Sequence, residues 1–336
     1  MHPLVSVILP VYNGLPYLEE AVNSVLSQSF RNFELIIVND GSTDGSELVI
    51  ENFTDKRIHL FQQENRGLAV TLNRAISLSR GKYIARQDQD DVSFPFRFER
   101  QVQFLDANQD VGMVGAGAEI WVGHNRTNRL LSHPAENAVL KFELLFDNHF
   151  VHSSVMIRRS VFDNIGCYSE VASRQPPEDY ELWSRVMKEY KLANLPDVLV
   201  AYREVVGSMS RTGQSPFLRN LITISSENIA WASGHSVEEA KVIALSKLIH
   251  GVYDNIPGKA RFREMRNILM LAANKIAADA GISPSQLDRV LRVRINKLRY
   301  QYIDYHCYGL IGMLVNSKVA GYLKKYAKQL FCLMHK

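Results

Sequence analysis

Apolar and polar residues alternate along the first 120 positions in a pattern that predicts strands and helices in turn. Short apolar runs that are typical of buried strands lie at 5–10, 33–38, 58–62 and 83–85. Apolar residues at helical spacing lie between and after them, at 18–26, 46–53, 68–79 and 95–108. Strands that alternate with helices of this length indicate βαβ units and a mostly parallel sheet.

The pattern changes from mixed to helical in the second half of the chain. Further strands are predicted at 111–122, 153–158 and 198–202, and a helix at 176–190. From residue 216 onward the spacing is helical, at 216–233, 236–253, 258–278, 284–305 and 319–334. We therefore expect an α/β domain at 1–212, followed by a helical C-terminal region at 213–336.

Three polar clusters follow strands of the predicted sheet. Pro10 to Asn13 come after the first strand, Asp40 to Ser42 after the second, and Asp88 to Asp91 after the strand at 83–85. In an open parallel sheet, ligands bind beyond the carboxyl ends of the strands. The sequence therefore predicts that an aromatic side chain and four carboxylates meet at one sheet edge.

The acidic cluster has two interpretations. Asp88, Asp90 and Asp91 repel one another unless water or a cation offsets their charge, and the neighbouring Arg86 supplies one such charge. One interpretation is a solvated acidic loop. The other is a site for a hard divalent cation, because Mg²⁺ and Mn²⁺ prefer oxygen ligands, commonly one or two carboxylates completed by water and substrate phosphates.

Asp40 also has two interpretations. Asp-Gly favours a turn, and Ser42, Thr43 or Asp44 could cap the helix that follows. Alternatively, the Asp40 carboxylate accepts a hydrogen bond from a nucleobase N–H while the ring of Tyr12 packs beside the base.

Glu178 and Asp179 follow two prolines at the start of a predicted helix. Acids suit a first helical turn, so both could be helix-start charges. Transfer of a group to an alcohol also needs a carboxylate within hydrogen-bond reach of the acceptor hydroxyl, and either residue could act as that general base.

Composition and charge narrow the class of protein. With 336 residues, of which 46% are hydrophobic and 22% charged, the chain can form a large globular domain and a smaller one. Three widely spaced cysteines favour a reducing cytosol over a disulfide scaffold or a zinc site. The N-terminal residues lack the basic region and long apolar stretch that a signal peptide needs, and no apolar run reaches the roughly 18 residues of a membrane span, so we expect neither.

The net charge of +4 is unevenly distributed. Residues 284–336 hold ten Lys/Arg and two acids, a net +8, so the preceding 283 residues carry 29 basic and 33 acidic residues, a net −4. The segment at 319–331 mixes lysines with aromatic residues at helical spacing. It is either a helix packed on the protein or an interfacial helix on an anionic membrane. The basic stretch at 289–299 matches no nucleic-acid-binding module, so no such partner is predicted.

The motifs taken together resemble the family 2 inverting glycosyltransferases of GT-A fold. The resemblance covers about residues 3–210 and rests on PVYN (10–13), NDGSTDGS (39–46), NRGLAVTLNRAI (65–76), DQDD (88–91) and PEDYELWSR (177–185). It implies an α/β fold of GT-A type, with a mostly parallel sheet flanked by helices. It also implies transfer of a sugar from a nucleotide-sugar donor similar to a UDP-sugar, with inversion.

The resemblance implies a role for each matching residue. Asp40 matches the aspartate that binds the nucleobase, and Tyr12 the aromatic residue that contacts the nucleoside. Asp88 and Asp90 match the DxD pair, whose second member is the main ligand of Mn²⁺ or Mg²⁺. Asp179 matches the catalytic base.

Further residues of these motifs belong to the expected site. The nucleotide-sugar site would include Pro10, Val11, Asn73 and Gln89, and the acceptor side would include Glu178 and Trp183. The acceptor would be a glycan or a lipid-linked molecule, as in bacterial surface polysaccharide biosynthesis. The enzyme would be cytoplasmic or peripheral on the inner face of the plasma membrane, with its basic C-terminal helices on anionic lipid.

One position departs from the family pattern. Many relatives follow the last strand with Tyr-Arg-x-His, whereas here Val205 stands in place of the histidine. Arg203 or Arg211 could contact phosphate instead.

Other classes of protein fit the sequence less well. A sugar-nucleotide pyrophosphorylase needs a Gly-rich basic loop after the first strand, and a dehydrogenase needs GxGxxG there. The sequence has neither. A non-catalytic nucleotide-sugar-binding module is the remaining alternative.

Overall fold

The computed structural model describes residues 2–205, 215–258 and 261–313. The chain forms two compact units, Met1–Ile224 and Ser225–Lys336. The domain boundary predicted after residue 212 falls among residues 206–214, outside the described part, and it stays a prediction. The first unit contains the whole sheet, and the second is helical.

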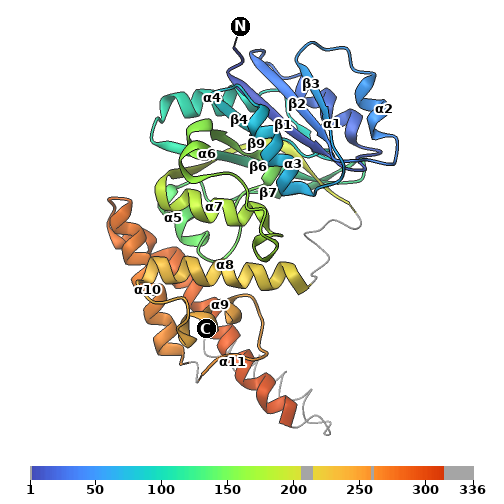
Figure 1. The fold of residues 1–336 in the computed structure, drawn as a ribbon. Coiled ribbons are helices and arrows are strands. Elements are labelled where there is room, and N and C mark those ends of the chain that lie inside the picture. Colours follow the sequence, from blue (N-terminus) through green and yellow to red (C-terminus); the bar gives the residue numbers. More distant parts are fainter. Residues whose placement is uncertain (1, 206–214, 259–260, 314–336) are drawn as a thin grey trace. The chain divides into compact units, whose positions relative to one another are not determined.

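The first unit is built on one mixed sheet flanked by helices (Figure 1). Its strands are β1 (Val5–Val11), β2 (Phe33–Asn39), β3 (Ile58–Gln62), β4 (Tyr83–Arg86), β5 (Val92–Ser93), β6 (Val111–Val122), β7 (Asn125–Leu131), β8 (Met156–Arg158) and β9 (Lys191–Glu204). They lie in the order β3-β2-β1-β4-β8-β6-β9-β5, with β7 paired to β6. The predicted α/β fold class is confirmed.

The helices of the first unit follow the strands as βαβ units require. They are α1 (Leu18–Leu26), α2 (Ser46–Glu51), α3 (Leu68–Leu78), α4 (Arg97–Ala107), α5 (Asn137–Glu143), α6 (Arg159–Ile165) and α7 (Glu178–Glu189), with short 3₁₀ turns at His152–Ser154 and Ala172–Arg174. Helices cover both faces of the parallel part of the sheet, and every residue of β1 and β2 is buried.

Strand register brings three loops to one edge of the sheet. β1 pairs in parallel with β2 on one side and with β4 on the other, and Val11 lies opposite Asn39. The N–H of Asp40 donates to the carbonyl of Val11 at 2.7 Å, and the N–H of Gln87 donates to the carbonyl of Ile8 at 3.0 Å. The chain segments that carry the polar clusters therefore leave the sheet beside one another.

Strand β9 is longer than the apolar run at 198–202 suggests. It pairs in parallel with β6 over most of its length and in antiparallel fashion with the short β5, where Val92 lies opposite Ala201. Because β5 directly follows the acidic loop, the end of β9 is held next to Asp90 and Asp91.

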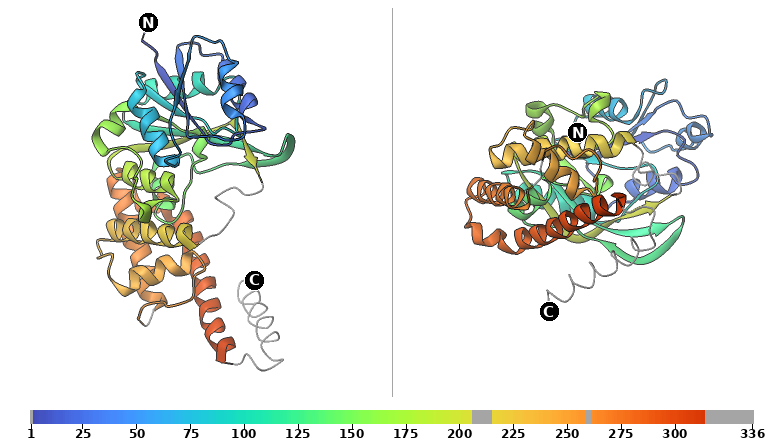
Figure 2. Two further views of the ribbon diagram at one scale, coloured as in Figure 1. Left: turned by 45° about the vertical axis from the view of Figure 1, so that its right-hand side comes forward. Right: turned by 90° about the horizontal axis from the view of Figure 1, so that it is seen from below.

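The second unit is helical, as predicted. Helix α8 (Ser215–Ser233) reaches it from the first unit, and α9 (Ala240–Ile249), α10 (Phe262–Asp279), a 3₁₀ turn at Pro284–Leu287 and α11 (Asp288–Met313) follow. Helices α10 and α11 lie side by side (Figure 2). Leu245, Ile268 and Leu298 are among its buried core residues. No helix in the described ranges is both long and apolar enough to span a bilayer.

Gly81, which precedes β4, gives a test of this packing. A Cβ built on Gly81 would lie 2.6 Å from the backbone nitrogen of Ser6 in β1, and backbone atoms cannot move aside cheaply. Gly81→Ala should therefore lower the free energy of unfolding by ~1–3 kcal/mol. The exposed neighbour Lys82→Ala should change it by about 0.5 kcal/mol or less. Urea unfolding measures both; equal effects would contradict the predicted clash.

Candidate active site

The loop after β1 is bound to the acidic loop by a pair of reciprocal hydrogen bonds. The N–H of Tyr12 donates to Oε1 of Gln89 at 2.8 Å, and Nε2 of Gln89 donates to the carbonyl of Tyr12 at 3.0 Å. The Tyr12 side chain is 48% exposed, so its ring is accessible from solvent. Pro10 and Val11, the last residues of β1, are buried.

The same loop is bound to the loop after β2. The N–H of Asn13 donates to Oγ of Ser42 at 3.0 Å, and the N–H of Thr43 donates to Oδ1 of Asn13 at 2.8 Å. Asn13 has a φ of 50°, in the left-handed region where asparagine is enriched. The three predicted loops therefore form one connected group.

Asp40 anchors the segment that leads into α3. Its carboxylate accepts hydrogen bonds from Nε2 of Gln63 at 2.6 Å, from the N–H of Arg66 at 2.8 Å and from the N–H of Gly67 at 2.9 Å. Asp40 is buried. The start of α2 is bound instead by Asp44, whose Oδ1 accepts from the N–H of Ser46 at 3.0 Å.

The carboxylates of the acidic loop have different environments. Asp91 is buried and accepts hydrogen bonds from the Ser153 hydroxyl and the N–H of Arg203. Asp88 forms an ion pair with the buried guanidinium of Arg86 at 2.5 Å. Asp90 is partly exposed, and within the described ranges no other side chain forms a hydrogen bond or ion pair with its carboxylate. The loop is therefore not simply a solvated acidic loop.

The charge of Asp90 is poorly compensated in this structure. Burial, and next the negative charge of Asp88, raise the pKa of Asp90 to about 6. A hard cation would relieve both effects, and carboxylate oxygens are the ligands it prefers. Among the described residues no three acidic, His or Cys side chains form a metal cage. A Mg²⁺ or Mn²⁺ ion held by one or two carboxylates, with water and phosphates as its other ligands, fits this donor set.

Asp179 lies in the first turn of α7 and is held at both oxygens. Its Oδ2 accepts from Nδ2 of Asn148 at 2.7 Å, and its Oδ1 accepts from the N–H of Tyr180 at 2.7 Å. Burial, then the charge of Glu178, and more weakly that of Asp88, raise the pKa of Asp179 to about 7. The acidic loop and α7 are connected through neighbouring residues of one 3₁₀ turn: the Ser153 hydroxyl donates to Asp91, and the ring of His152 packs against that of Trp183 at 5.9 Å between centroids.

Glu178 and Trp183 lie deeper than the expected acceptor contacts suggest. Glu178 is 8% exposed, and burial raises its pKa. Trp183 is fully buried and packs against the rings of Phe150, His152 and Tyr168, at 5.9–6.4 Å between centroids. Trp183 therefore belongs to the packed interior in this structure, and a direct acceptor contact by it stays a prediction.

A half-buried histidine and a buried tyrosine that the sequence did not single out adjoin these residues. Nε2 of His152 lies 2.9 Å from the hydroxyl of Tyr168. Burial, and next the charge of Arg86, lower the pKa of His152 to about 3, so its imidazole is neutral. The side chain of Asn73 contacts the same region. Its Oδ1 accepts from the N–H of Tyr168, and its Nδ2 donates to the carbonyl of Tyr168 and to the carboxylate of Glu170. No sequence motif could have identified His152 or Tyr168, because each is an isolated residue.

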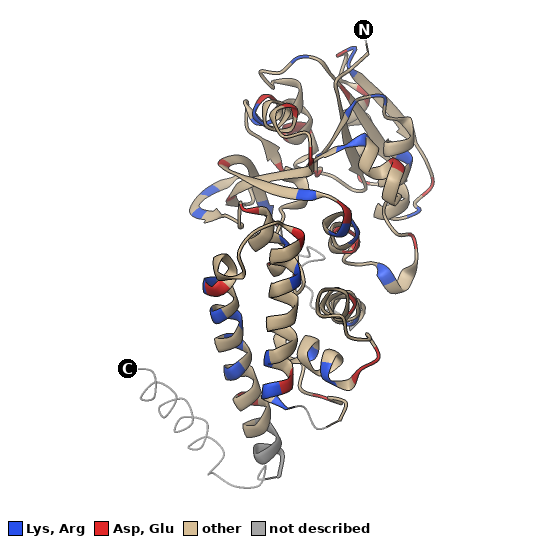
Figure 3. Ribbon diagram, turned by 90° about the vertical axis from the view of Figure 1, so that its left-hand side faces the viewer, with Lys and Arg blue, Asp and Glu red and all other residues tan. Residues whose placement is uncertain are grey.

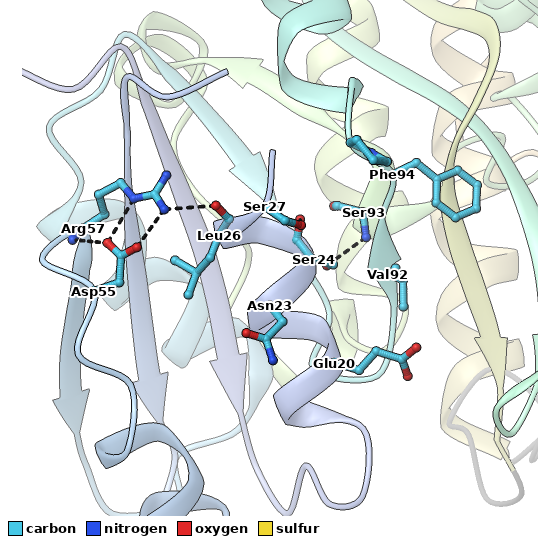
Figure 4. Close-up of a pocket in the computed structure, with 11 residues that line it drawn as sticks. Glu20, Asn23, Ser24, Leu26, Ser27, Asp55, Arg57, Val92, Ser93 and Phe94 are labelled. Atoms are coloured by element: carbon cyan, nitrogen blue, oxygen red, sulfur yellow. Dashed lines mark hydrogen bonds and ion pairs between the residues drawn. The ribbon is translucent and has the colours of Figure 1, made fainter. Parts of the chain in front are cut away.

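A separate hollow lies beside α1. It has a volume of about 590 Å³ and is lined by residues of α1, by Asp55 and Arg57, and by β5 with the residues that follow (Figure 4). Arg57 is already paired with Asp55 at 2.7 Å. None of the site residues predicted from the sequence lines this hollow.

Comparison with known proteins identifies the class of protein to which this fold and this edge of acidic and aromatic residues belong. The family model described as Glycosyl transferase family 2 matches residues 6–166. The chain is 35% identical to EpsE of Bacillus subtilis (strain 168), a proposed glycosyltransferase, over 229 residues, which are 66% of this chain and 81% of EpsE. The chain therefore belongs to glycosyl transferase family 2, and it is a glycosyltransferase. It spans less than two thirds of the length of several further relatives.

Solved structures confirm the predicted GT-A-type fold. S. aureus TarS 1–349, crystallised in complex with UDP-GlcNAc, superposes with a TM-score of 0.59 over 91% of each chain at 21% identity. The mannosyltransferase PcManGT from Pyrobaculum calidifontis, in complex with GDP-Man and Mn²⁺, superposes with a TM-score of 0.52 at 18% identity, over 90% of this chain and 86% of PcManGT. At these identities the likeness concerns the fold alone.

The hydrogen bond from Asn148 should set the ionisation of Asp179. Oδ1 of Asn148 accepts from the N–H of Phe150 at 2.9 Å, which orients Nδ2 toward Asp179. A donor stabilises a carboxylate, so Asn148→Ala should move the titration midpoint of Asp179 above about 7, by about one pH unit. Carboxyl ¹³C NMR measures this midpoint. Asn164→Ala, a surface amide on α6, is the control, and an unchanged midpoint in Asn148→Ala would refute the role of this bond.

Proposed function

We propose that this enzyme transfers a sugar from a nucleotide-sugar donor, a UDP-sugar, to a hydroxyl of a glycan or lipid-linked acceptor with inversion at the anomeric carbon. This proposal is supported by the contacts that bind the loop of Tyr12 to the acidic loop, and that link the acidic loop through Ser153 and His152 to α7, the helix that carries Asp179. Donor, cation and proton acceptor are the three components that such a transfer needs.

The nucleotide would bind at the edge formed by the loops after β1, β2 and β4. Tyr12 presents an accessible ring, and Asp40 directly follows the adjoining strand β2, with its carboxylate held in place. Asp88 and Gln89 would face the ribose and sugar, with Pro10, Val11 and Asn73 forming the surroundings. The UDP-GlcNAc in the TarS complex supports a uridine nucleotide as the donor's leaving group.

Asp90, with Asp88 beside it, would hold Mn²⁺ or Mg²⁺. When bound, the ion offsets the negative charge that develops on the departing nucleoside diphosphate. The Mn²⁺ in the PcManGT complex supports a divalent ion in this fold. The protein's own contribution is to keep Asp90 available: Arg86 pairs with Asp88, and Asp91 is engaged by Ser153 and Arg203.

Asp179 would accept the proton of the attacking hydroxyl. Its raised pKa keeps it basic enough to take a proton near neutral pH, and Asn148 holds the accepting carboxylate in one orientation. The acceptor oxygen would then displace the nucleotide directly, which inverts the anomeric centre. Glu178 and Trp183 lie on this side of the site and would shape the acceptor region.

The second unit would bring the enzyme to its acceptor. Lys and Arg recur along α10 and α11 (Figure 3), and Arg263, Arg266, Arg289 and Arg292 are exposed. This charge suits an anionic membrane surface at the inner face of the plasma membrane and, with it, a lipid-linked acceptor of surface polysaccharide biosynthesis. The lysine-rich segment at 319–331 lies outside the described residues.

Replacing the proposed base separates binding from turnover. Asp179→Asn should reduce turnover by roughly 10²–10⁴-fold, because the amide cannot accept the proton, while donor binding survives. Release of UDP from a panel of UDP-sugars, followed by mass spectrometry, measures turnover, and calorimetry measures binding. Undiminished turnover in Asp179→Asn would exclude this residue as the base.

The pKa of Asp179 also predicts a pH profile. Only the carboxylate form accepts a proton, and burial raises its pKa to about 7. Wild-type turnover should therefore rise with pH through about 7 and level off above it. A rate that is constant from pH 5 to 8 would contradict Asp179 as the group that must be ionised.

Asp90 gives a test of the cation site. Asp90→Ala should weaken UDP binding in the presence of Mn²⁺ and leave the weaker binding without Mn²⁺ nearly unchanged, because it removes a ligand rather than a nucleotide contact. Calorimetric titration with and without Mn²⁺ measures the difference. Full wild-type activity in excess chelator would remove the metal from the proposal.

A further inference from the structure

Arg203, near the end of β9, has a guanidinium that is almost completely enclosed and fully bonded. Its side chain is 1% exposed. Nε donates to the carbonyl of Asp90 at 2.6 Å, Nη2 forms an ion pair with Glu20 of α1 at 2.7 Å, and Nη1 donates to the carbonyl of Gly123. Every nitrogen of the guanidinium is engaged, so in this structure Arg203 does not present a free group to a phosphate.

Aromatic rings fix the plane of this guanidinium. Its central carbon lies 4.3 Å from the ring centroid of Tyr17, just before α1, and 5.3 Å from that of Trp121 at the end of β6. A guanidinium is a rigid planar fork, so stacking and three directed bonds leave it one position. The side chain joins α1, the β6–β7 turn and the acidic loop.

Arg203 holds the acidic loop at two adjacent points. Its backbone N–H donates to Oδ1 of Asp91 at 2.7 Å, while its side chain holds the carbonyl of Asp90. The contact with Asp91 is made by the backbone of β9, so it survives substitution of the Arg203 side chain. The second depends on the guanidinium and acts on the peptide unit that follows Asp90.

We propose that Arg203 is a positioning residue for the donor site: by holding the Asp90 carbonyl, it fixes the direction in which the Asp90 carboxylate points. Val205, two residues further along, stands where the family pattern has a histidine, and its side chain has no donor or acceptor for a metal or a phosphate. This inference rests on the proposed role of Asp90.

Three variants isolate the side-chain contact. Arg203→Met keeps bulk but removes the charge and every donor. Arg203→Lys keeps the charge for Glu20 but loses the planar fork that reaches Asp90. Glu20→Gln weakens the ion pair at the far end and leaves the bond to Asp90 in place. Glu20 lies on α1 beside Val92 of β5 (Figure 4), and it is bound by Nη2 of Arg203, whereas Nε holds the Asp90 carbonyl.

The full-length chain is titrated with UDP, with and without Mn²⁺, and its unfolding temperature is recorded for each variant. The affinity for UDP with Mn²⁺ should fall about tenfold or more in Arg203→Met and Arg203→Lys. The affinity without Mn²⁺ should stay within about twofold of wild type. Glu20→Gln should keep both affinities, even if its unfolding temperature falls as far as that of Arg203→Lys.

A purely structural role predicts a different pattern, in which affinity follows unfolding temperature across all variants. That pattern would overturn the inference. Wild-type affinity for UDP with Mn²⁺ in Arg203→Lys would overturn it as well. Arg203→Lys therefore keeps the test decisive even if Arg203→Met does not fold. Asp90→Asn is the reference. If it loses Mn²⁺-dependent binding while the Arg203 variants keep it, the positioning role fails and the proposed function stands. If Asp90→Asn binds UDP with Mn²⁺ as tightly as wild type does, the positioning role of Arg203 and the proposed cation site at Asp90 both fail.

Discussion

The burial of several carboxylates at one edge of the sheet is the constraint around which the site is organised. The register of β1 with β2 and β4 places the loops together, and α7 adds Glu178 and Asp179. Arg86 offsets part of this negative charge because its guanidinium forms an ion pair with Asp88. Burial, and next the charge of a neighbouring carboxylate, raise the pKa of both Asp90 and Asp179, which supports the proposed cation site at Asp90 and the proposed base at Asp179.

The sequence predicts the parts of the protein that follow from local pattern. The predicted strand at 58–62 and the predicted helix at 18–26 match the structure to the residue, because apolar spacing gives a clear local signal in both segments. The convergence of loops after β1, β2 and β4 also follows, since parallel strands end at one edge. The family motifs identify which residues of these loops to expect in the site.

Long-range contacts are what the sequence does not reveal. The hairpin partner β7 is polar and largely exposed, so it lacks a strand pattern, and β5 has only two residues. The bond from Asn148 to Asp179 joins residues 31 positions apart, and the pair of His152 and Tyr168 has no motif. Trp183 looks like an acceptor contact in the motif but is fully buried. Each of these depends on packing between distant segments.

Diffraction from crystals grown with UDP and Mn²⁺ tests the central claim most directly, because manganese scatters anomalously and marks its own position. We expect one anomalous peak in direct contact with the Asp90 carboxylate, the diphosphate against it, the base beside Tyr12 and Asp40, and Asp179 facing the space where a sugar would lie. A peak remote from Asp90, or UDP bound in the hollow beside α1, would contradict this account.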